Sequence, residues 1–382
     1  MPSIDADPYA DIRPYTDAEA PAVLARLASN SDLANALADL KLQWLKRVSP
    51  MLARWLCQRW LSRKLRDVQT IADFQLLIEP ELAKLLDATA QFSCSGLDQL
   101  ESNRSWLFVS NHRDITMDPA LTNYAMHHGG HRTLSIAIGD NLLTRSWVAD
   151  LMRLNKSFVV KRNIKGPREL MAASKQLSGF MRDMIENNRG PLWIAQREGR
   201  AKDGIDATEP AVIKMLSLSR DRKTESIADV LSRLHIVPVA ISYELDPCDA
   251  MKAAELSAGP GYEKAPDEDV RSIGYGIAGD KGCVHLSFGD PIMSDDLTIE
   301  QVVAAIDGHM MQHYRLYETN LWAWQRLEQS DQLPGVAIHS GAVSKQAFHA
   351  RIDAMPEAIQ PFALAMYANP LRQALAAAGE AS

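Results

Sequence analysis

The chain has 382 residues, which predicts one large domain, or one large domain with a smaller one. Hydrophobic residues make up 46% and charged residues 23% of the chain, an ordinary globular composition that excludes long disorder beyond the first twenty or so residues. There are 41 Lys and Arg against 48 Asp and Glu, so the net charge is −7. A dedicated nucleic-acid-binding protein would usually be basic, so that class is not expected.

Cysteine spacing and hydropathy restrict the setting in which the protein works. The four cysteines are scattered without a Cys-x-x-Cys pair, which argues against a disulfide scaffold and a zinc knuckle and favours reduced thiols in the cytoplasm. Residues 1–16 are acidic and rich in proline, unlike the basic and then apolar start of a signal peptide. No run of about eighteen apolar residues occurs, so no membrane-spanning helix is expected.

Basic residues and tryptophans gather in a helical pattern near the start of the chain. Residues 41–66 contain eight Lys or Arg and no acidic residue, together with Trp44, Trp55 and Trp60. A basic, Trp-rich amphipathic helix is typical of a surface that meets an anionic membrane. Tryptophans packed in the core of a helical bundle are the alternative. The two can coexist on opposite faces of the same helices.

From about residue 103 the chain alternates short apolar runs with longer helical patterns, which is typical of an α/β sheet with helices on its faces. We predict an α/β fold with a mixed, mostly parallel sheet flanked by helices. The predicted strands are residues 106–110, 133–138, 157–161, 191–196, 235–243 and 284–288. The predicted parts of the chain are a flexible tail, a helical N-terminal segment, an α/β domain and a C-terminal helical extension, at residues 1–20, 21–95, 96–295 and 296–382.

Proline and glycine positions predict three local features. Pro238 lies inside a predicted strand and indicates an edge or a bulge there. The glycines between Gly274 and Gly279 predict an ordinary loop. Asn369 followed by Pro370 predicts the start of a final short helix.

The segment Ser110–Ala120 combines a histidine with nearby carboxylates. His112 lies between a predicted strand and a predicted helix, at the carboxyl end of the strand, where α/β folds place their sites. Asp118 and Pro119 fit the N-cap and the first position of that helix. A carboxylate downstream can reach the imidazole Nδ1, fix the tautomer and support the cation formed when Nε2 takes a proton. The pattern predicts a general base, with ordinary loop structure as the alternative.

Basic residues also follow two other predicted strands. Arg162 ends one strand, and Arg197, Arg200 and Lys202 follow the next. If the strands are parallel, both loops open at the same edge of the sheet as His112. Arginine at such an edge suits bidentate phosphate binding, whereas an ordinary surface ion pair is the alternative for each cation.

The order of these segments resembles the glycerol-3-phosphate and 1-acylglycerol-3-phosphate acyltransferase superfamily, in a bacterial member with long N- and C-terminal extensions. Four motifs of that family have counterparts in the family order, over roughly residues 100–245. They are a His followed by an Asp, an apolar strand that ends in Arg, a turn containing Glu-Gly, and an apolar strand with a Val-Pro core. Here they are His112 to Asp118, Phe158 to Arg162, Arg197-Glu198-Gly199-Arg200 and Val237-Pro238-Val239.

The resemblance implies an O-acyltransferase of phospholipid synthesis. It would move a fatty acyl group from acyl-CoA or acyl carrier protein to a hydroxyl of glycerol-3-phosphate or lysophosphatidate, with His112 as general base oriented by Asp118. No metal and no cofactor beyond the thioester co-substrate is implied. The expected location is the cytoplasm, with peripheral contact at the inner face of the membrane. The residues implied to bind the acceptor are Arg162, Glu198, Gly199, Arg200 and Lys202.

The sequence departs from the family pattern at two motifs. Five residues separate His112 from Asp118, where the family has four, so Asp114 stays an alternative partner of the histidine. The Asp-Pro helix start favours Asp118. In the third motif, Gln196 and Arg197 stand where the family has Phe-Pro, which leaves the details of acceptor binding open.

Three other functions are alternatives to acyl transfer to these acceptors. Another lysolipid as acceptor stays open, and so does a protein of the same fold that binds lipid or carrier protein without catalysis. His112-Arg113-Asp114 spells the catalytic-loop triplet of protein kinases. Pro119 stands where a kinase needs Asn, and no Asp-Phe-Gly occurs, so the kinase alternative is excluded.

Overall fold

The computed structural model describes residues 7–379 except 266, 332 and 334, and it divides into two compact units. The two units interleave in the sequence. The division into four consecutive parts that the sequence suggested stays a prediction. Unit 1 comprises Met1–Leu82 and Ser135–Phe180, and unit 2 comprises Ala83–Leu134 and Met181–Ser382.

Unit 1 is mainly helical. Apolar side chains from its helices form a core in which Leu24, Leu27, Phe74 and Leu154 are buried, and α2 and α4 share a second, smaller cluster. Its two strands, β3 and β4, pair in parallel. The elements of unit 1 are α1 (Ala20–Ser29), α2 (Ser31–Lys41), α3 (Gln43–Val48), α4 (Pro50–Lys64), β3 (Ser135–Gly139), η2 (Asp140–Leu142), α7 (Ser146–Leu154), β4 (Ser157–Val160) and the first parts of α5 (Ile71–Thr89) and α8 (Pro167–Glu186).

Residues 7–19 are anchored to the rest of unit 1. Ile12 is buried, and its carbonyl accepts a hydrogen bond of 2.8 Å from the N–H of Val159. Arg13 donates to Glu19 at 2.7 Å. The buried side chain of Ile12 therefore holds this acidic stretch against the rest of unit 1, although the composition predicted a flexible tail. Residues 1–6 of that predicted tail lie outside the described residues.

The tryptophans of the basic segment are exposed. Trp44 of α3 is 68% exposed, and Trp55 and Trp60 of α4 are 52% and 42% exposed. The alternative in which these three side chains pack in a core is therefore wrong. No helix of the described ranges combines the length and the apolar character needed to cross a membrane. The buried face of α4 is made by Ala53, Cys57 and Leu61.

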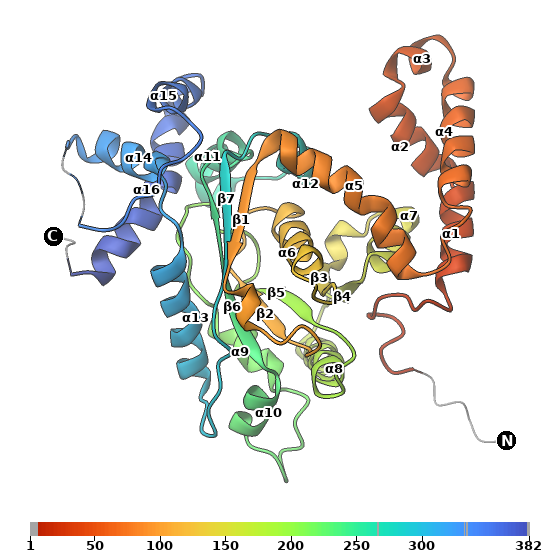
Figure 1. The fold of residues 1–382 in the computed structure, drawn as a ribbon, viewed down its shortest axis with the longest axis horizontal. Coiled ribbons are helices and arrows are strands. Elements are labelled where there is room, and N and C mark those ends of the chain that lie inside the picture. Colours follow the sequence, from red (N-terminus) through yellow and green to blue (C-terminus); the bar gives the residue numbers. More distant parts are fainter. Residues whose placement is uncertain (1–6, 266, 332, 334, 380–382) are drawn as a thin grey trace. The chain divides into compact units, whose positions relative to one another are not determined.

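Unit 2 is built on parallel strands. In its described part the strands follow the order β1-β7-β6-β2-β5 (Figure 1). β2 pairs in parallel with β5 and β6, β1 pairs in parallel with β7, and β6 and β7 are antiparallel. The predicted mixed, mostly parallel α/β fold is confirmed. The strands are β1 (Gln91–Ser95), β2 (Leu107–Ser110), β5 (Leu192–Ala195), β6 (Ile236–Tyr243) and β7 (Cys283–Phe288).

Helices cover both faces of this sheet, with α6 on one side and α13 on the other (Figure 1). The C-terminal helices share a core of their own, in which Trp322, Phe348 and Tyr367 are buried. The predicted helices at both ends of the chain are therefore present. The helices of unit 2 are η1 (Leu97–Gln99), α6 (Met117–His128), α9 (Pro210–Leu216), α10 (Ile227–Arg233), α11 (Asp249–Ala258), η3 (Gly259–Gly261), α12 (Glu268–Ala278), α13 (Ile299–His313), α14 (Glu318–Glu328), α15 (Lys345–Asp353), η4 (Glu357–Ile359) and α16 (Gln360–Ala377).

Two elements of unit 2 differ from the sequence-based expectation. β1 was assigned to the helical segment, because most of its side chains are exposed and it lacks an apolar pattern. The glycine-rich stretch expected to be a loop forms the C-terminal part of α12, residues 274–278. Its Gly276 allows close packing, since a Cβ there would lie 2.0 Å from Asp114 Oδ2.

Two prolines also occupy unexpected positions. β6 pairs on both sides and is not an edge strand, but its ladder with β7 begins at Val239, one residue after Pro238. Pro370 lies inside α16 and does not begin a helix. A proline removes the N–H that would bond the carbonyl four residues earlier, here Met366. Gly204 approaches that carbonyl so closely that a Cβ would lie 2.1 Å from the oxygen, which docks α16 on the loop after β5.

Candidate active site

His112 lies beside Asp118 in the connection from β2 to α6. The Nδ1 atom of His112 is 2.7 Å from Asp118 Oδ2. The Asp118 side chain is fully buried, whereas 15% of the His112 side chain is exposed. Within the described ranges Asp118 is the only hydrogen-bond partner of the ring, which leaves Nε2 open. The structure thus brings His112 together with Asp118 and not with Asp114.

Asn111 and Ala201 fix the loop that carries His112. The side chain of Asn111 donates to the carbonyl of Ile241 at 3.0 Å and accepts from the N–H of the same residue at 2.8 Å. It therefore continues the pairing with β6 after β2 has ended. On the other side, the N–H of Ala201 donates to the carbonyl of His112 at 2.8 Å. These bonds hold the histidine backbone between β6 and the loop that follows β5.

Asp118 accepts hydrogen bonds from three groups besides the imidazole. The N–H groups of Arg113 and Asp114 donate to Oδ2 at 2.6 and 3.0 Å, and the buried hydroxyl of Tyr243 donates to Oδ1 at 2.7 Å. Burial alone would raise the pKa of Asp118, but the bond to His112, the positive charge that ring can carry and these other donors lower it below the usual value. The carboxylate is therefore held in its ionised form.

Asp114 bonds backbone N–H groups at the start of helix α6 and does not bond the histidine. Its Oδ1 accepts from the N–H groups of Thr116 and Met117 at 2.9 and 2.8 Å. Helix α6 begins at Met117 with Thr116 as N-cap, so the predicted helix start at Asp118 and Pro119 is wrong by two residues. Burial and the neighbouring Asp118 charge raise the pKa of Asp114.

Trp193 of β5 supports the imidazole from the side. The centroids of the two rings are 5.6 Å apart and the planes meet at 70°, an edge-to-face arrangement. The indole N–H donates to Ser110 Oγ at 3.1 Å, which fixes the orientation of the tryptophan. Because Trp193 is buried, it leaves the His112 ring little freedom on that side.

The loop after β5 carries most of the predicted acceptor-binding residues next to His112. Gly199 has a φ of +74°, a left-handed conformation that favours glycine. Arg200 donates to Ser272 Oγ at 2.7 Å, and Lys202 forms an ion pair with Glu255. The side chain of Glu198 is exposed at the surface of the loop. The hydrogen bond from Ala201 to His112 places this group beside the histidine.

Arg162 belongs to unit 1, whereas the other predicted site residues belong to unit 2. It lies two residues after the end of β4, and its N–H donates to Asp140 Oδ1 at 3.1 Å. Its predicted part in the same site stays a prediction.

A buried ion pair lies beneath the His112 loop. Arg113 Nη2 is 2.5 Å from Asp206 Oδ2, and the two side chains are only 9% and 8% exposed. Arg113 also donates to the carbonyl of Gly204 at 3.2 Å, and its guanidinium lies 5.4 Å from the centre of the Tyr314 ring. Burial raises the pKa of Asp206, although Arg113 and the Asn111 amide oppose that shift. This pair ties the His112 loop to the loop that follows β5.

Several of these positioning residues were missed by sequence reasoning. Tyr243 is the last residue of the predicted strand 235–243. Its place at the end of a strand is the one sequence signal that could have suggested a role in the site. Trp193 lies inside the predicted strand 191–196, and Ser272 lies far along the chain from His112. None of these roles follows from local spacing. Among the described residues, no group of His, Cys, Asp and Glu side chains gathers closely enough to hold a metal ion.

Comparison with known proteins bears on the same part of the chain. Residues 91–242 match the family described as Acyltransferase. The structure also has a match to the 1-acyl-sn-glycerophosphate (LPA) acyltransferase PlsC from Thermotoga maritima, with 11% sequence identity and a TM-score of 0.36, over 73% of this chain and 94% of that chain. No curated protein matches the sequence. The part that is similar to the Acyltransferase family, residues 91–242, contains His112, Asp118 and the loop after β5.

Proposed function

We propose that the protein moves a fatty acyl group from acyl-CoA or acyl carrier protein to a hydroxyl of glycerol-3-phosphate or lysophosphatidate. The observation that carries the proposal is the 2.7 Å contact between His112 Nδ1 and the ionised Asp118, with Nε2 left open. A histidine held in this way is a general base suited to a hydroxyl group. The match of residues 91–242 to the Acyltransferase family supports acyl transfer as the reaction.

The proposed reaction needs one proton carrier and no covalent enzyme intermediate. His112 Nε2 takes the proton of the acceptor hydroxyl while its oxygen attacks the thioester carbon. The tetrahedral intermediate then expels the thiolate as the C–S bond breaks, and the imidazolium returns the proton to the sulfur. Asp118 holds the tautomer that leaves Nε2 free to accept and stabilises the transient cation.

The proposed acceptor site uses the loop after β5. Arg200 would bind the acceptor phosphate, because guanidinium suits phosphate geometry and only one of its N–H groups has a partner in the described part of the chain. Glu198 and Gly199 would shape the turn around the acceptor. Lys202 would contribute only after release from Glu255. The part of Arg162, which belongs to the other unit, stays a prediction.

An acyl-transfer assay on the purified protein tests the proposal. Acyl-CoA and acyl carrier protein are supplied separately, each with glycerol-3-phosphate, lysophosphatidate or a neutral lysolipid. We expect product from a phosphate-bearing acceptor, and H112A should reduce the rate by about 10²–10⁴-fold. Product from the neutral lysolipid alone would favour the other lysolipid function. Donor binding without turnover on any acceptor would favour the non-catalytic function.

We also propose that the protein works in the cytoplasm, bound peripherally to the inner face of the membrane through α3 and α4. Exposed apolar side chains alternate there with cations. Lys41 lies over the Trp60 ring at 4.7 Å and Arg59 over the Trp55 ring at 5.5 Å. Such pairs place a cation and an indole at the same depth of a lipid interface. The exposed apolar side chains are Trp44, Val48, Met51, Leu52, Trp55, Leu56 and Trp60.

Co-sedimentation with vesicles tests this surface. Replacing Trp44, Trp55 and Trp60 together by serine should weaken binding to phosphatidylglycerol vesicles by about tenfold or more, since each indole inserts apolar area. Raised salt should weaken wild-type binding, because basic residues attract the anionic lipid. The control variant replaces three exposed apolar residues of unit 2, Val270, Met293 and Leu333. Equal losses in both variants, or binding that ignores salt, would contradict the proposal.

A further inference from the structure

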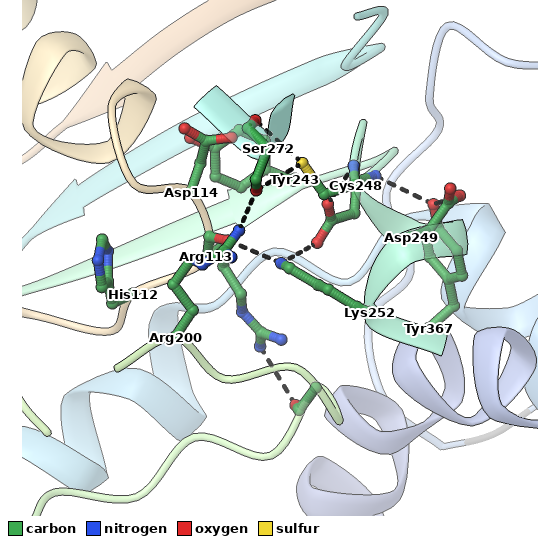
Figure 2. Close-up of polar contacts among 12 residues, drawn as sticks. His112, Arg113, Asp114, Arg200, Tyr243, Cys248, Asp249, Lys252, Ser272 and Tyr367 are labelled. Atoms are coloured by element: carbon green, nitrogen blue, oxygen red, sulfur yellow. Dashed lines mark hydrogen bonds and ion pairs between the residues drawn. The ribbon is translucent and has the colours of Figure 1, made fainter. Parts of the chain in front are cut away.

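Two helices between β6 and β7 hold two of the three cations of the loop after β5, Arg200 and Lys202. Helices α11 and α12 lie outside residues 91–242, the part that matches the Acyltransferase family. Arg200 reaches across to Ser272 of α12, as Figure 2 shows. Lys202 pairs with Glu255 of α11. The partners of both cations therefore come from a segment that the family match does not include.

The two cations are held by groups of different charge. Ser272 is neutral and takes one of the five N–H groups of a guanidinium, so Arg200 keeps its charge and most of its donors. Glu255 is a carboxylate, and its ion pair offsets the charge of Lys202. The two side chains of that pair are 25% and 20% exposed, so water screens their attraction only in part. Of these two cations, only Arg200 therefore offers an available positive charge.

Helix α11 is fixed to the His112 loop, which gives Glu255 a defined position. Lys252 lies one turn before Glu255 and is 2% exposed. Its ammonium group donates to the carbonyl of Arg113 at 2.7 Å and pairs with Asp246 (Figure 2). The helix that presents Glu255 to Lys202 is therefore bonded to the residue next to His112.

We propose that Glu255 is a specificity-determining residue for the charge of the acceptor, an inference that rests on the proposed function. A phosphomonoester carries about −1.5 to −2 charges at neutral pH, whereas a phosphodiester carries one. By holding Lys202, Glu255 removes a cation that would favour the phosphomonoester. The wild-type site therefore discriminates weakly between the two classes of headgroup, and release of Lys202 makes it prefer the phosphomonoester.

Direct binding to the full chain tests this inference without turnover. The probes are glycerol-3-phosphate, a phosphomonoester, and glycerophosphoglycerol, a phosphodiester, titrated calorimetrically at pH 7.5. E255Q should tighten binding of glycerol-3-phosphate by about fivefold, the upper end of an exposed ion pair, with a smaller change for the phosphodiester. Adding K202Q to E255Q should abolish the gain. The matched control D269N removes the α12 carboxylate that pairs with Lys264.

The outcomes separate this inference from the proposed function. Equal affinity of E255Q and D269N for glycerol-3-phosphate overturns the role of Glu255, and so does the absence of binding by both proteins in the millimolar range. An equal gain for both probes overturns the charge selectivity. Acyl transfer that H112A abolishes supports the proposed function in each case. Conversely, the expected selectivity in a protein without turnover supports the role of Glu255 and contradicts catalysis.

Discussion

Replacing Asp118 by asparagine is expected to lower kcat for acyl transfer by about 10²–10⁴-fold. The Asp118 carboxylate lies 2.7 Å from His112 Nδ1 and accepts from three other donors. A neutral amide cannot stabilise the imidazolium. Its NH₂ group can also donate to Nδ1, which would move the ring proton to Nε2 and block the atom that must accept a proton.

The matched control is Asp114→Asn. Asp114 is also a buried carboxylate in the same loop, but it bonds the N–H groups of Thr116 and Met117. Asparagine keeps an acceptor oxygen for those bonds, so kcat should fall by less than about tenfold. Both variants are compared by kcat at saturating donor and by circular dichroism, which checks that they fold. A larger loss in D114N than in D118N would contradict the assignment of Asp118.

Replacing Arg113 by leucine is expected to lower the free energy of unfolding by about 3–5 kcal/mol. Arg113 and Asp206 form an ion pair of 2.5 Å with little exposure of either side chain. Leucine fills part of the space but leaves the Asp206 carboxylate without its cation. One hydrogen bond of 3.1 Å, from the Asn111 amide to Oδ2, would remain, and Oδ1 already has no partner. Urea denaturation measures the loss.

The loss in R113L should grow as the pH rises. Burial raises the pKa of Asp206 above 3.8, and Arg113 opposes that shift, so its removal raises the pKa further. The folded variant then keeps a proton at pH values where the unfolded chain has released it. More bound protons in the folded state mean that stability falls with rising pH, so the deficit at pH 8 should exceed that at pH 5.

A partly exposed arginine provides the control for that measurement. Arg326 pairs with Asp353 at 2.7 Å, and the two side chains are 32% and 57% exposed. R326L should change the free energy of unfolding by no more than about 1 kcal/mol at either pH. A deficit of R113L that is as small as that of R326L, or the same at pH 5 and pH 8, would show that Asp206 does not depend on its buried partner.

Local sequence patterns were sufficient to predict most of the strands and helices of the fold. The strands β2 and β6 are buried along their whole length, and a buried parallel strand appears in a sequence as a continuous apolar run. The edge strand β1 escapes this rule because its exposed side chains need not be apolar. The glycine-rich part of helix α12 was predicted as a loop because glycine has a low helix propensity. Close packing of Gly276 on Asp114, a contact that local sequence does not show, favours the helix there.

The sequence by itself determined the pairing of His112 with a carboxylate, because both lie in one short connection between a strand and a helix. It also predicted that basic residues follow β5 at the same edge of the sheet. Only the tertiary structure decided that Tyr243 bonds Asp118, that Glu255 holds Lys202 and that Arg113 pairs with Asp206. These contacts join residues far apart in the chain. They depend on strand order and helix packing, which local spacing does not encode.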